Sequence, residues 1–276
     1  MGGCFPWGYF MHTVVCIKQI IDPEIPPDLF RLDPATKRQI RGGLSLVISA
    51  YDQNALEVAL QLKAKAGGTV TALSIGAAEA QGAVKSALGM GVDAGVLVAD
   101  PATAGSDPFG TAAVLAAAVR KLAPVDLVLT GCVSGDTGSK AIPLLLAEEL
   151  GWPGLTFVSR IEAREGTVRA RRLLPDGYET VAAALPLVVG IISDDTNVPR
   201  YSKLKDIMAA ARKSVPNWKL SDLGLDASRV GPAAHRLVLR DLVIPKRESR
   251  CELIGGETPE EQAAALAARL RELKVF

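Results

Sequence analysis

The stretch VDLVLTGCVSGDTGSKAIPLLLAEEL, residues 125–150, contains the unit from which the fold is built. Residues 125–130 are rich in valine and leucine, which predicts a buried strand. Residues 131–139 form a loop of glycines and hydroxyl side chains, and residues 141–150 have the pattern of a helix. A strand, a short loop and a helix in this order are typical of βαβ units and a parallel sheet.

The same alternation recurs toward the N-terminus. Gly67-Gly68 gives one predicted helix a clear C-terminal stop. The first strand has an unbroken apolar run, so we expect it to be buried on both faces, and a proline-rich loop with room for a small hairpin follows it. The cycles predict a doubly wound, mostly parallel sheet. Its expected elements are a strand at 14–17, a helix at 52–66, a strand at 69–75, a helix near 79–89, a strand at 95–99 and a helix at 108–122.

Beyond residue 155 the pattern changes. Residues 156–162 and 167–174 alternate polar and apolar side chains around Arg164-Glu165-Gly166, which predicts a β-hairpin excursion. Strand character resumes at 187–192, and regular pattern is then sparse after Pro216. We therefore expect an N-terminal extension of unclear role at 1–11, an α/β domain at 12–214 and a C-terminal arm at 215–276.

The arm ends in a predicted helix that opens at Thr258-Pro259-Glu260-Glu261. Thr258 is suited to cap this helix, Pro259 to its first position, and Glu261 to reach back to the amide of the cap residue. We expect the arm to pack on another subunit.

Composition excludes several classes of function. Lys and Arg number 31 against 30 Asp and Glu, a formal net charge of +1 without a basic cluster, so we expect no nucleic-acid partner. The longest apolar runs are shorter than the ~20 residues that cross a bilayer, so we expect no membrane insertion. The four cysteines lack C-x-x-C spacing and only two histidines are present, which argues against a metal site or a histidine-based catalytic triad. Scattered cysteines suggest a reducing compartment, the cytoplasm.

Ligands of an open parallel sheet bind beyond the carboxyl ends of its strands, which directs attention to three loops. These are residues 16–19, 74–77 and 131–139. In the third, glycines allow close backbone approach, and free amides at a helix start favour an anion such as phosphate. It is not a Walker A loop, because Lys140 is not followed by Ser or Thr.

Two interpretations of this loop stay open from the residues alone. It binds a phosphate, or it is an ordinary strand-to-helix turn with Thr137 or Ser139 as the cap. Asp136 in the loop and Asp52 at the start of the first long helix each suit either a ribose hydroxyl or a helix cap, and capping is the commoner use.

Residues 197–204, NVPRYSKL, form a presented loop that leads into a short basic helix ending near Lys213. Leu204 suits an exposed apolar anchor for a weak protein contact. From the residues alone, a core stripe formed by Leu204 and Ile207 is the favoured alternative, because the two are three positions apart on the helix.

Several motifs resemble the electron-transfer flavoprotein beta subunit family, from about residue 12 to the end of the chain. The most specific are Leu185-Pro186 with Val188-Val189, and the pattern N-x-P-R-Y-x-x-L-x-x-I-M over residues 197–208 with a basic tail. Further similarities are found at residues 16–19, at Tyr51-Asp52 with Ala55 and Glu57, at 87–93, at 150–153, at 251–252 and at 256–261.

This resemblance implies an adenine-nucleotide α-hydrolase-like, Rossmann-like fold and an alpha subunit that carries the redox-active FAD near the shared interface. It implies a buried AMP without catalytic role in this chain. The residues to which the nucleotide site then maps are Cys16, Ser49, Ala50, Tyr51, Asp52, Ser74, Gly131, Cys132, Val133, Ser134, Gly135, Asp136, Thr137, Gly138 and Ser139.

The resemblance also makes residues from 197 onward a recognition loop for flavin-dependent dehydrogenases. Leu204 would then dock on the partner, which reverses the core-stripe interpretation. The docking residues so implied are Asn197, Pro199, Arg200, Tyr201, Leu204, Ile207 and Met208. Electrons would pass on to a quinone-linked or other downstream acceptor, and no catalytic residue is expected in this chain.

Departures from the family pattern keep two alternatives in view. Ser49-Ala50-Tyr51 stands where the family has Asn-Pro-Phe, the loop at 131–139 is shorter and lacks a Gln, and Leu173 replaces an acidic residue expected near the flavin. In the first alternative, the chain belongs to an electron-bifurcating flavoprotein in which a second FAD replaces AMP and takes hydride from NADH. In the second, it is a stand-alone regulatory module that binds ATP.

Overall fold

The computed structural model describes residues 10–164, 166–245 and 251–275. The predicted N-terminal extension therefore lies outside the described residues, apart from Phe10 and Met11; Met11 is buried in the core. The chain divides into two compact units, Met1–Val238 and Leu239–Phe276.

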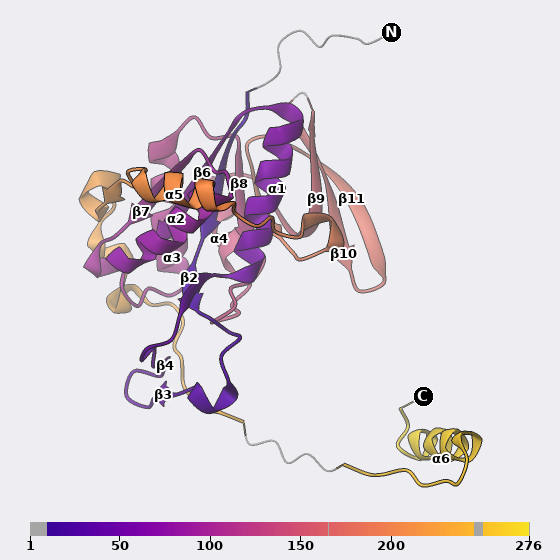
Figure 1. Cartoon of the computed structure of the whole chain (residues 1–276). Helices are drawn as coiled ribbons and strands as arrows, with labels where there is room; N and C mark the ends of the chain where they lie inside the picture. Colours follow the sequence, from indigo (N-terminus) through magenta and orange to yellow (C-terminus); the bar gives the residue numbers. More distant parts are fainter. Residues whose placement is uncertain (1–9, 165, 246–250, 276) are drawn as a thin grey trace, which may run out of the picture. The chain divides into compact units, whose positions relative to one another are not determined.

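A nine-stranded sheet forms the centre of the first unit, in the order β11-β10-β9-β12-β8-β1-β6-β7-β13 (Figure 1). All pairs from β9 to β13 are parallel. From β1 the chain extends the sheet through β6 and β7 on one side and through β8 to β9, β10 and β11 on the other, with β12 between β8 and β9. The sheet is therefore doubly wound, as predicted. The parallel strands are β1 (His12–Ile17), β6 (Thr69–Ile75), β7 (Ala94–Val98), β8 (Leu127–Gly131), β9 (Gly154–Arg164), β12 (Leu187–Ile191) and β13 (Asn217–Trp218).

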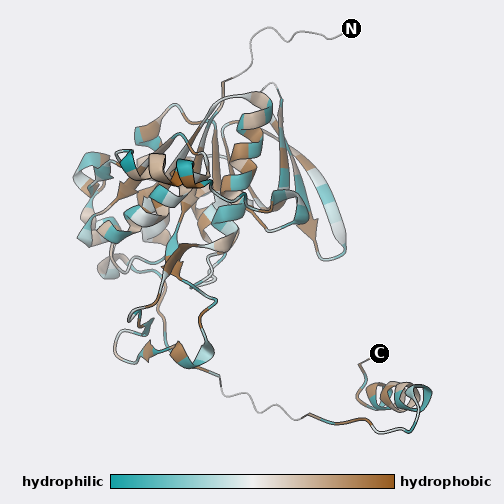
Figure 2. Cartoon of the chain, viewed as in Figure 1, coloured by the Kyte–Doolittle hydropathy of each residue, from teal (hydrophilic) through white to brown (hydrophobic). Residues whose placement is uncertain are grey.

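Two apolar clusters, one on each face of the sheet, hold the helices in place. The first joins the sheet to α1 (Ala50–Ala66) and α2 (Gln81–Met90), and α5 (Leu204–Arg212) packs against α2. The second joins it to α3 (Pro108–Leu122) and α4 (Ile142–Leu150). Figure 2 shows the hydrophobic residues concentrated in the central strands. In the part of the chain that the structure describes, no helix combines the length and the hydropathy needed to cross a membrane.

The predicted β-hairpin is confirmed, and the structure adds a strand that the sequence did not predict. The strands β9 and β10 (Thr167–Leu174) pair antiparallel, and β11 (Gly177–Ala184) then pairs antiparallel with β10 along its whole length. Half of β11 is alanine and glycine, residues of low β-propensity, so its local sequence gives a weak strand signal. Hydrogen bonds to β10, and not local strand propensity, therefore hold β11 in the sheet.

The arm boundary predicted at residue 215 needs a correction, because residues 215–238 belong to the first unit. Pro216 and Trp218 accept backbone hydrogen bonds from β7 residues or their neighbours, and Leu220 and Val230 are buried in the second apolar cluster. These contacts are tertiary and have no local periodic signal. The turns of this segment are η5 (Leu220–Leu223), η6 (Ala227–Arg229) and η7 (Pro232–Ala234).

The long loop after β1 contains the small hairpin for which its sequence had room. It holds β2 (Gln19–Ile21) paired with β5 (Leu46–Ile48), and β3 (Leu32–Asp33) paired with β4 (Arg38–Gln39). Short 3-10 turns complete the unit at η1 (Pro27–Leu29), η2 (Ala78–Ala80), η3 (Pro101–Thr103) and η4 (Asp195–Asn197).

The second unit contains the predicted final helix, α6 (Pro259–Glu272), which carries both hydrophilic and hydrophobic residues (Figure 2). Thr258 Oγ1 accepts a hydrogen bond from Glu261 N at 3.2 Å, which confirms the cap. Glu261 Oε2 accepts from Glu257 N, one residue before the predicted cap amide. No residue of α6 is buried in the described part of the chain.

Candidate functional site at the switch point of the sheet

The winding of the sheet reverses between β1 and β8. After β1 the chain continues to β6 on one side of the sheet. After β8 it continues to the other side, where β12 and β9 lie, so the loops after β1 and β8 lead in opposite directions at the carboxyl edge. Ligands of doubly wound sheets bind at such a switch point, and we call the region between these two loops the switch-point crevice. Two of the three loops chosen from the sequence, 16–19 and 131–139, start here, and Ser74 lies at the end of the neighbouring strand β6.

Asp52 joins these two loops. Its carboxylate accepts a hydrogen bond from Lys18 N at 2.8 Å on one oxygen and from Gly131 N at 2.9 Å on the other. The side chain comes from the third residue of α1 and is only 7% exposed. Burial raises the pKa of Asp52 to about 7, against the opposing effect of the two backbone donors. Asp52 therefore does not cap α1, so the helix-cap interpretation is wrong, and its contact with a ribose hydroxyl stays a prediction.

The glycine-rich loop is folded by its own hydroxyl side chains and by contacts to α1. Ser134 and Thr137 share a hydrogen bond between their hydroxyls at 2.9 Å, and Gly138 N donates to Ser134 O at 3.1 Å. Gly135 N donates to Ser49 Oγ at 3.3 Å. Ser49 is fully buried and does not cap α1, although it is the N-cap residue, because its hydroxyl faces the loop instead.

Asp136 in this loop forms an ion pair with Lys18, at 2.6 Å between Nζ and Oδ2. Burial tends to raise the pKa of Asp136, but the Lys18 ammonium and further hydrogen bonds hold it below its usual value. Asp136 is therefore an ionised partner of Lys18, so its helix-cap interpretation is wrong. Lys18 was inside a predicted loop but was not predicted as a site residue, because an exposed lysine has no local signal of its partner.

The helix after the loop begins without a side-chain cap. Ala141 is the N-cap residue of α4, and no side chain accepts a hydrogen bond from the first turn. The interpretation of Thr137 or Ser139 as a capping residue is therefore wrong. Residues 135–140 are exposed, so the loop presents an uncapped helix start at the crevice. Uncapped amides at such a position favour an anion.

Buried polar groups line the strand ends. Ser74 is fully buried in β6, and in the described part of the chain its Oγ has no hydrogen-bond partner. A buried hydroxyl normally has a partner, so this atom fits a ligand group that reaches it. Cys16 and Cys132 are buried free thiols; burial raises the pKa of Cys16 strongly and that of Cys132 to about 11, so both are neutral. Neutral thiols are not nucleophiles at physiological pH.

Two glycines make the crevice possible. A Cβ on Gly131 would lie 2.5 Å from Asp52 Oδ1 and 2.8 Å from the Tyr51 Cβ, so only glycine allows α1 to approach β8 this closely. A Cβ on Gly135 would lie 2.9 Å from Ile20 Cδ1. The close backbone packing, the unpartnered Ser74 hydroxyl and the uncapped start of α4 thus all lie at the carboxyl edge of the sheet. Of the other predicted residues, Ala50 is the first residue of α1 and Val133 lies in the glycine-rich loop.

The second predicted site, the loop at 197–208, is held by a buried amide. Asn197 is fully buried and its Nδ2 donates to the carbonyls of Ser159 and Ile192, each at 2.9 Å. Its Oδ1 accepts from Asp194 N and from Asn54 Nδ2. Its predicted contact with a partner is therefore wrong: a polar side chain with this many internal partners anchors the loop and cannot leave it.

Arg200 also braces the loop, through an ion pair with Glu57 of α1. The residues beyond it turn outward: Tyr201 is 98% exposed and Leu204 is 73% exposed, with Ile207 and Met208 about half exposed. Pro199 lies partly buried between anchor and tip. The core-stripe interpretation of Leu204 and Ile207 is thus wrong. Glu57 was not predicted as a site residue, because nothing in the local helix pattern indicates a partner so distant in sequence.

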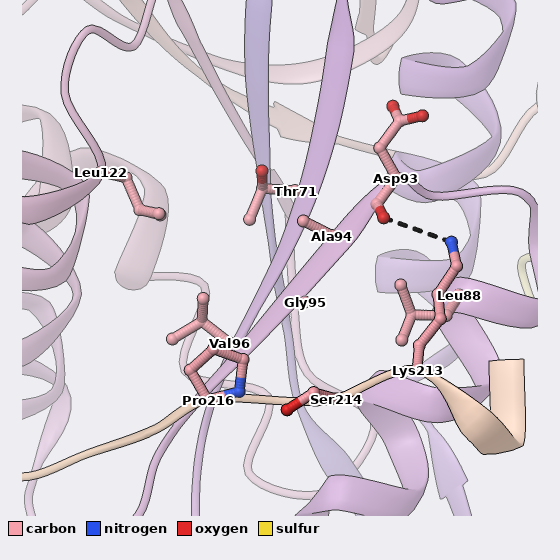
Figure 3. Close-up of a pocket in the computed structure, with 10 residues that line it drawn as sticks. All are labelled: Thr71, Leu88, Asp93, Ala94, Gly95, Val96, Leu122, Lys213, Ser214 and Pro216. Carbon is pink, nitrogen blue, oxygen red and sulfur yellow. Dashed lines mark hydrogen bonds between the residues drawn. The ribbon is translucent and has the colours of Figure 1, made fainter.

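Two cavities lie away from the crevice. One of about 580 Å³ is lined by β5, α2, α5 and the loop, including Arg200 and Tyr201. The other, of about 410 Å³, lies at the amino end of β7, where Lys213 Nζ donates to the Asp93 carbonyl at 3.2 Å (Figure 3). That edge is opposite to the one that binds ligands in such sheets. Within the described residues, no group of three or more His, Cys, Asp or Glu side chains is arranged to hold a metal.

The doubly wound parallel sheet, with two loops joined by Asp52 at its switch point, defines a Rossmann-like α/β protein. A family model, the electron transfer flavoprotein domain, matches residues 40–223. The chain belongs to the electron-transfer flavoprotein beta subunit family.

Three relatives illustrate the similarity. The electron transfer flavoprotein subunit beta of Clostridium acetobutylicum is 34% identical over 95% of this chain and 98% of its own length. Protein FixA of Azotobacter vinelandii is 34% identical over 94% of each chain. The caffeyl-CoA reductase-Etf complex subunit CarD of Acetobacterium woodii is 32% identical over 96% of this chain and 100% of its own.

Proposed function

We propose that this chain is the beta subunit of a heterodimeric electron-transfer flavoprotein. The heterodimer carries electrons from flavin-dependent dehydrogenases to a quinone-linked or other downstream acceptor. FAD is held mainly by the alpha subunit, and AMP occupies the switch-point crevice of this chain as a structural ligand. The observation that carries this proposal is the buried, unpartnered Ser74 hydroxyl in β6, at the same edge of the sheet as the exposed glycine-rich loop after β8.

In this proposal, the residues of this chain bind and position the nucleotide and take part in no chemical step. The exposed amides of residues 135–140 and the uncapped start of α4 suit the phosphate, and the Ser74 hydroxyl suits a polar group of the nucleoside. Lys18 adds a positive charge that Asp136 partly neutralises. The flavin, when bound, supplies one- or two-electron transfer, and the protein tunes it by charge and burial.

An exposed sheet face supports a large protein partner. The outer face of β9, β10 and β11 carries Arg160, Arg169 and Arg171 together with Tyr178, whose ring lies 3.5 Å from the Arg171 guanidinium carbon. Small side chains such as Ala182 lie between them. Arginine and tyrosine are enriched in protein interfaces. We assign this face and the C-terminal arm, with its exposed Leu242, Val243 and Leu253, to contacts with the alpha subunit.

The tip of the loop at 197–208 is the proposed docking site for dehydrogenases. It places Tyr201, Leu204 and Met208 in solvent on a base that Asn197 and Arg200 hold in place. A small apolar tip on a fixed base suits a contact that forms and breaks quickly. The described cysteines are free thiols, which supports a reducing compartment and hence the cytoplasm.

A second candidate function is a subunit of an electron-bifurcating complex, in which a second FAD replaces AMP and accepts hydride from NADH. The similarity to CarD, named as a subunit of a caffeyl-CoA reductase-Etf complex, favours keeping this candidate. The exposed loop at 135–140 supports it as well, because an open loop leaves space for a ligand longer than AMP. Two flavins per heterodimer would decide for it.

Co-expression tests the proposal. Production of this chain with the alpha subunit of the same organism is expected to give a yellow heterodimer, whereas this chain alone is expected to retain no tightly bound FAD. A monodisperse monomer that binds ATP and forms no complex with the alpha subunit would contradict the proposal and favour a stand-alone regulatory module.

A further inference from the structure

Asp52 has a different place in the crevice from the other predicted site residues. Both of its carboxylate oxygens accept backbone hydrogen bonds, from Lys18 N at 2.8 Å and Gly131 N at 2.9 Å. These amides belong to segments 34 and 79 residues away, which follow β1 and end β8. One side chain of α1 therefore holds together the two strand ends between which the crevice opens.

We propose that Asp52 is a positioning residue that sets the width of the switch-point crevice and makes nucleotide binding depend on its ionisation. The inference rests on the proposed function, because it concerns the adenosine nucleotide assigned to this crevice. Asp52 acts through the Lys18 and Gly131 backbones, to which its oxygens are bonded, and its side chain is buried beneath them, only 7% exposed.

The geometry leaves little freedom for other arrangements. Gly131 approaches so closely that a Cβ would lie 2.5 Å from Asp52 Oδ1, so the carboxylate cannot move toward β8. The helix start next to it is fixed as well, because Asp52 N donates to Ser49 O at 3.0 Å and Ser49 Oγ accepts from Gly135 N. The glycine-rich loop is thus held to the start of α1 at two points, Gly131 by Asp52 and Gly135 by Ser49, and release of Asp52 removes the first.

Ionisation changes this arrangement because a protonated carboxyl presents an O–H where one of the two backbone N–H groups needs an acceptor. The titratable groups that face Asp52 are Cys16 on β1, Lys18 after it, and Cys132 and Asp136 after β8. Lys18 favours the carboxylate and Asp136 opposes it, while burial, the largest effect, raises the pKa of Asp52 to about 7. The two cysteines stay neutral across this range. As pH falls through neutrality, protonation of Asp52 is therefore expected to loosen its bonds to the two strand ends and to widen the crevice.

The test uses the purified heterodimer after removal of its nucleotide, titrated calorimetrically with AMP and separately with FAD at pH 6, 7 and 8. For whichever ligand binds, the wild type is expected to lose at least threefold in affinity between pH 8 and pH 6. Asp52→Asn is expected to bind at least tenfold more weakly at pH 8 and to retain only the pH dependence of the ligand's own phosphate. Asp93→Asn is the matched control: it removes a carboxylate that accepts a backbone hydrogen bond, from Val70 N at 2.9 Å, at the opposite edge of the sheet, and it is expected to keep the wild-type pH dependence.

Hydrogen exchange of the same complexes provides the second measurement. Asp52→Asn is expected to speed exchange in peptides covering 16–19 and 131–139 and to leave those of α3 unchanged. Wild-type affinity and pH dependence in Asp52→Asn would overturn the inference, as would unchanged exchange in both loops. If the wild-type heterodimer binds neither AMP nor FAD at this site, the proposed function fails, and that outcome is distinguishable because it appears before any substitution is made.

Discussion

Arg200 and Glu57 form an ion pair with two hydrogen bonds that fixes the loop at 197–208 to α1. Arg200 Nε lies 2.7 Å from Glu57 Oε2, and Nη2 lies 2.9 Å from Oε1. Arg200 N donates to the same carboxylate at 3.2 Å. Glu57 is buried in the middle of the helix whose first turn carries Asp52, so α1 supports both the switch-point crevice and the loop at 197–208.

Loss of this pair is expected to loosen the loop without unfolding the sheet. In Glu57→Gln, one partner charge disappears and Arg200 keeps weaker hydrogen bonds, so we expect the free energy of unfolding to fall by about 2 kcal/mol. Urea denaturation of the variant measures this change. Glu79→Gln, which removes an exposed partner of Arg41, is the control and is expected to change stability by less than about 1 kcal/mol. Equal effects of the two substitutions would contradict the structural role of Glu57.

The Glu57 pair also predicts a pH dependence. Burial would raise the pKa of Glu57, but hydrogen bonds from Arg200 and Gln61 outweigh burial and hold it below its usual value. The pair therefore contributes stability above the unfolded-state pKa, near 4.3, and loses it as pH falls through the lower folded-state pKa. The stability difference between wild type and Glu57→Gln is expected to shrink below pH 4. A difference that stays constant down to pH 3 would contradict this assignment.

Asp52 predicts a pH dependence of the unfolding free energy with the opposite sign. Its folded-state pKa, about 7, is above the unfolded value, so its contribution to stability is fully present below pH 4 and is lost as pH rises through 7. The unfolding free energy of the wild type is therefore expected to decline relative to that of Asp52→Asn between pH 5 and pH 8. Chemical denaturation at several pH values measures the unfolding free energy of both proteins. If the wild type becomes more stable relative to Asp52→Asn as pH rises over this range, the Asp52 pKa is not raised.

Ser74→Ala separates binding from folding. The Ser74 hydroxyl is buried without a partner in the described residues, so its removal is expected to leave the free energy of unfolding of the nucleotide-free protein unchanged within about 0.5 kcal/mol or slightly raised. The same substitution is expected to weaken AMP binding about tenfold, since a ligand group would lose its partner. Ser86→Ala, which removes a hydroxyl bonded to Gly82 O within α2, is the control. Wild-type AMP affinity in Ser74→Ala would exclude this hydroxyl from the site.

Leu204→Ala tests the docking tip. The side chain is mostly exposed, so stability is expected to change by less than about 0.5 kcal/mol. The rate at which a dehydrogenase of the same organism reduces the heterodimer is expected to fall several-fold at low dehydrogenase concentration and to recover at high concentration. Leu144→Ala, an exposed leucine on α4, should leave the rate unchanged. If both variants behave like the wild type, the dehydrogenase contacts another surface.

Local sequence predicted the elements whose signals are local. The helix α3 has its predicted bounds because Asp107 and Pro108 mark its start, and Asp107 Oδ1 accepts from Gly110 N at 3.0 Å. The strand β11 was missed because its alanines give no strand pattern. The segment at 215–238 was assigned to the arm because its contacts with β7 and the second apolar cluster are tertiary.

In the candidate site too, features with a local sequence signal were predicted and features that depend on tertiary contacts were not. Its loops could be placed at the carboxyl edge from strand order alone. The roles of Asp52 and Asn197 could not, because each depends on atoms from segments distant in sequence: Asp52 bonds to Gly131, and Asn197 bonds to Asn54. A short polar side chain has the same local appearance whether it contacts a ligand or a backbone amide.

The most direct test of the account is the identity and amount of the small molecules released when the purified heterodimer is denatured. An adenosine nucleotide in the crevice of this chain predicts one AMP together with one FAD per heterodimer. Two FAD and no AMP would keep the crevice as a nucleotide site and select the bifurcating alternative. One FAD and no further adenosine nucleotide would contradict the claim that this crevice binds a nucleotide.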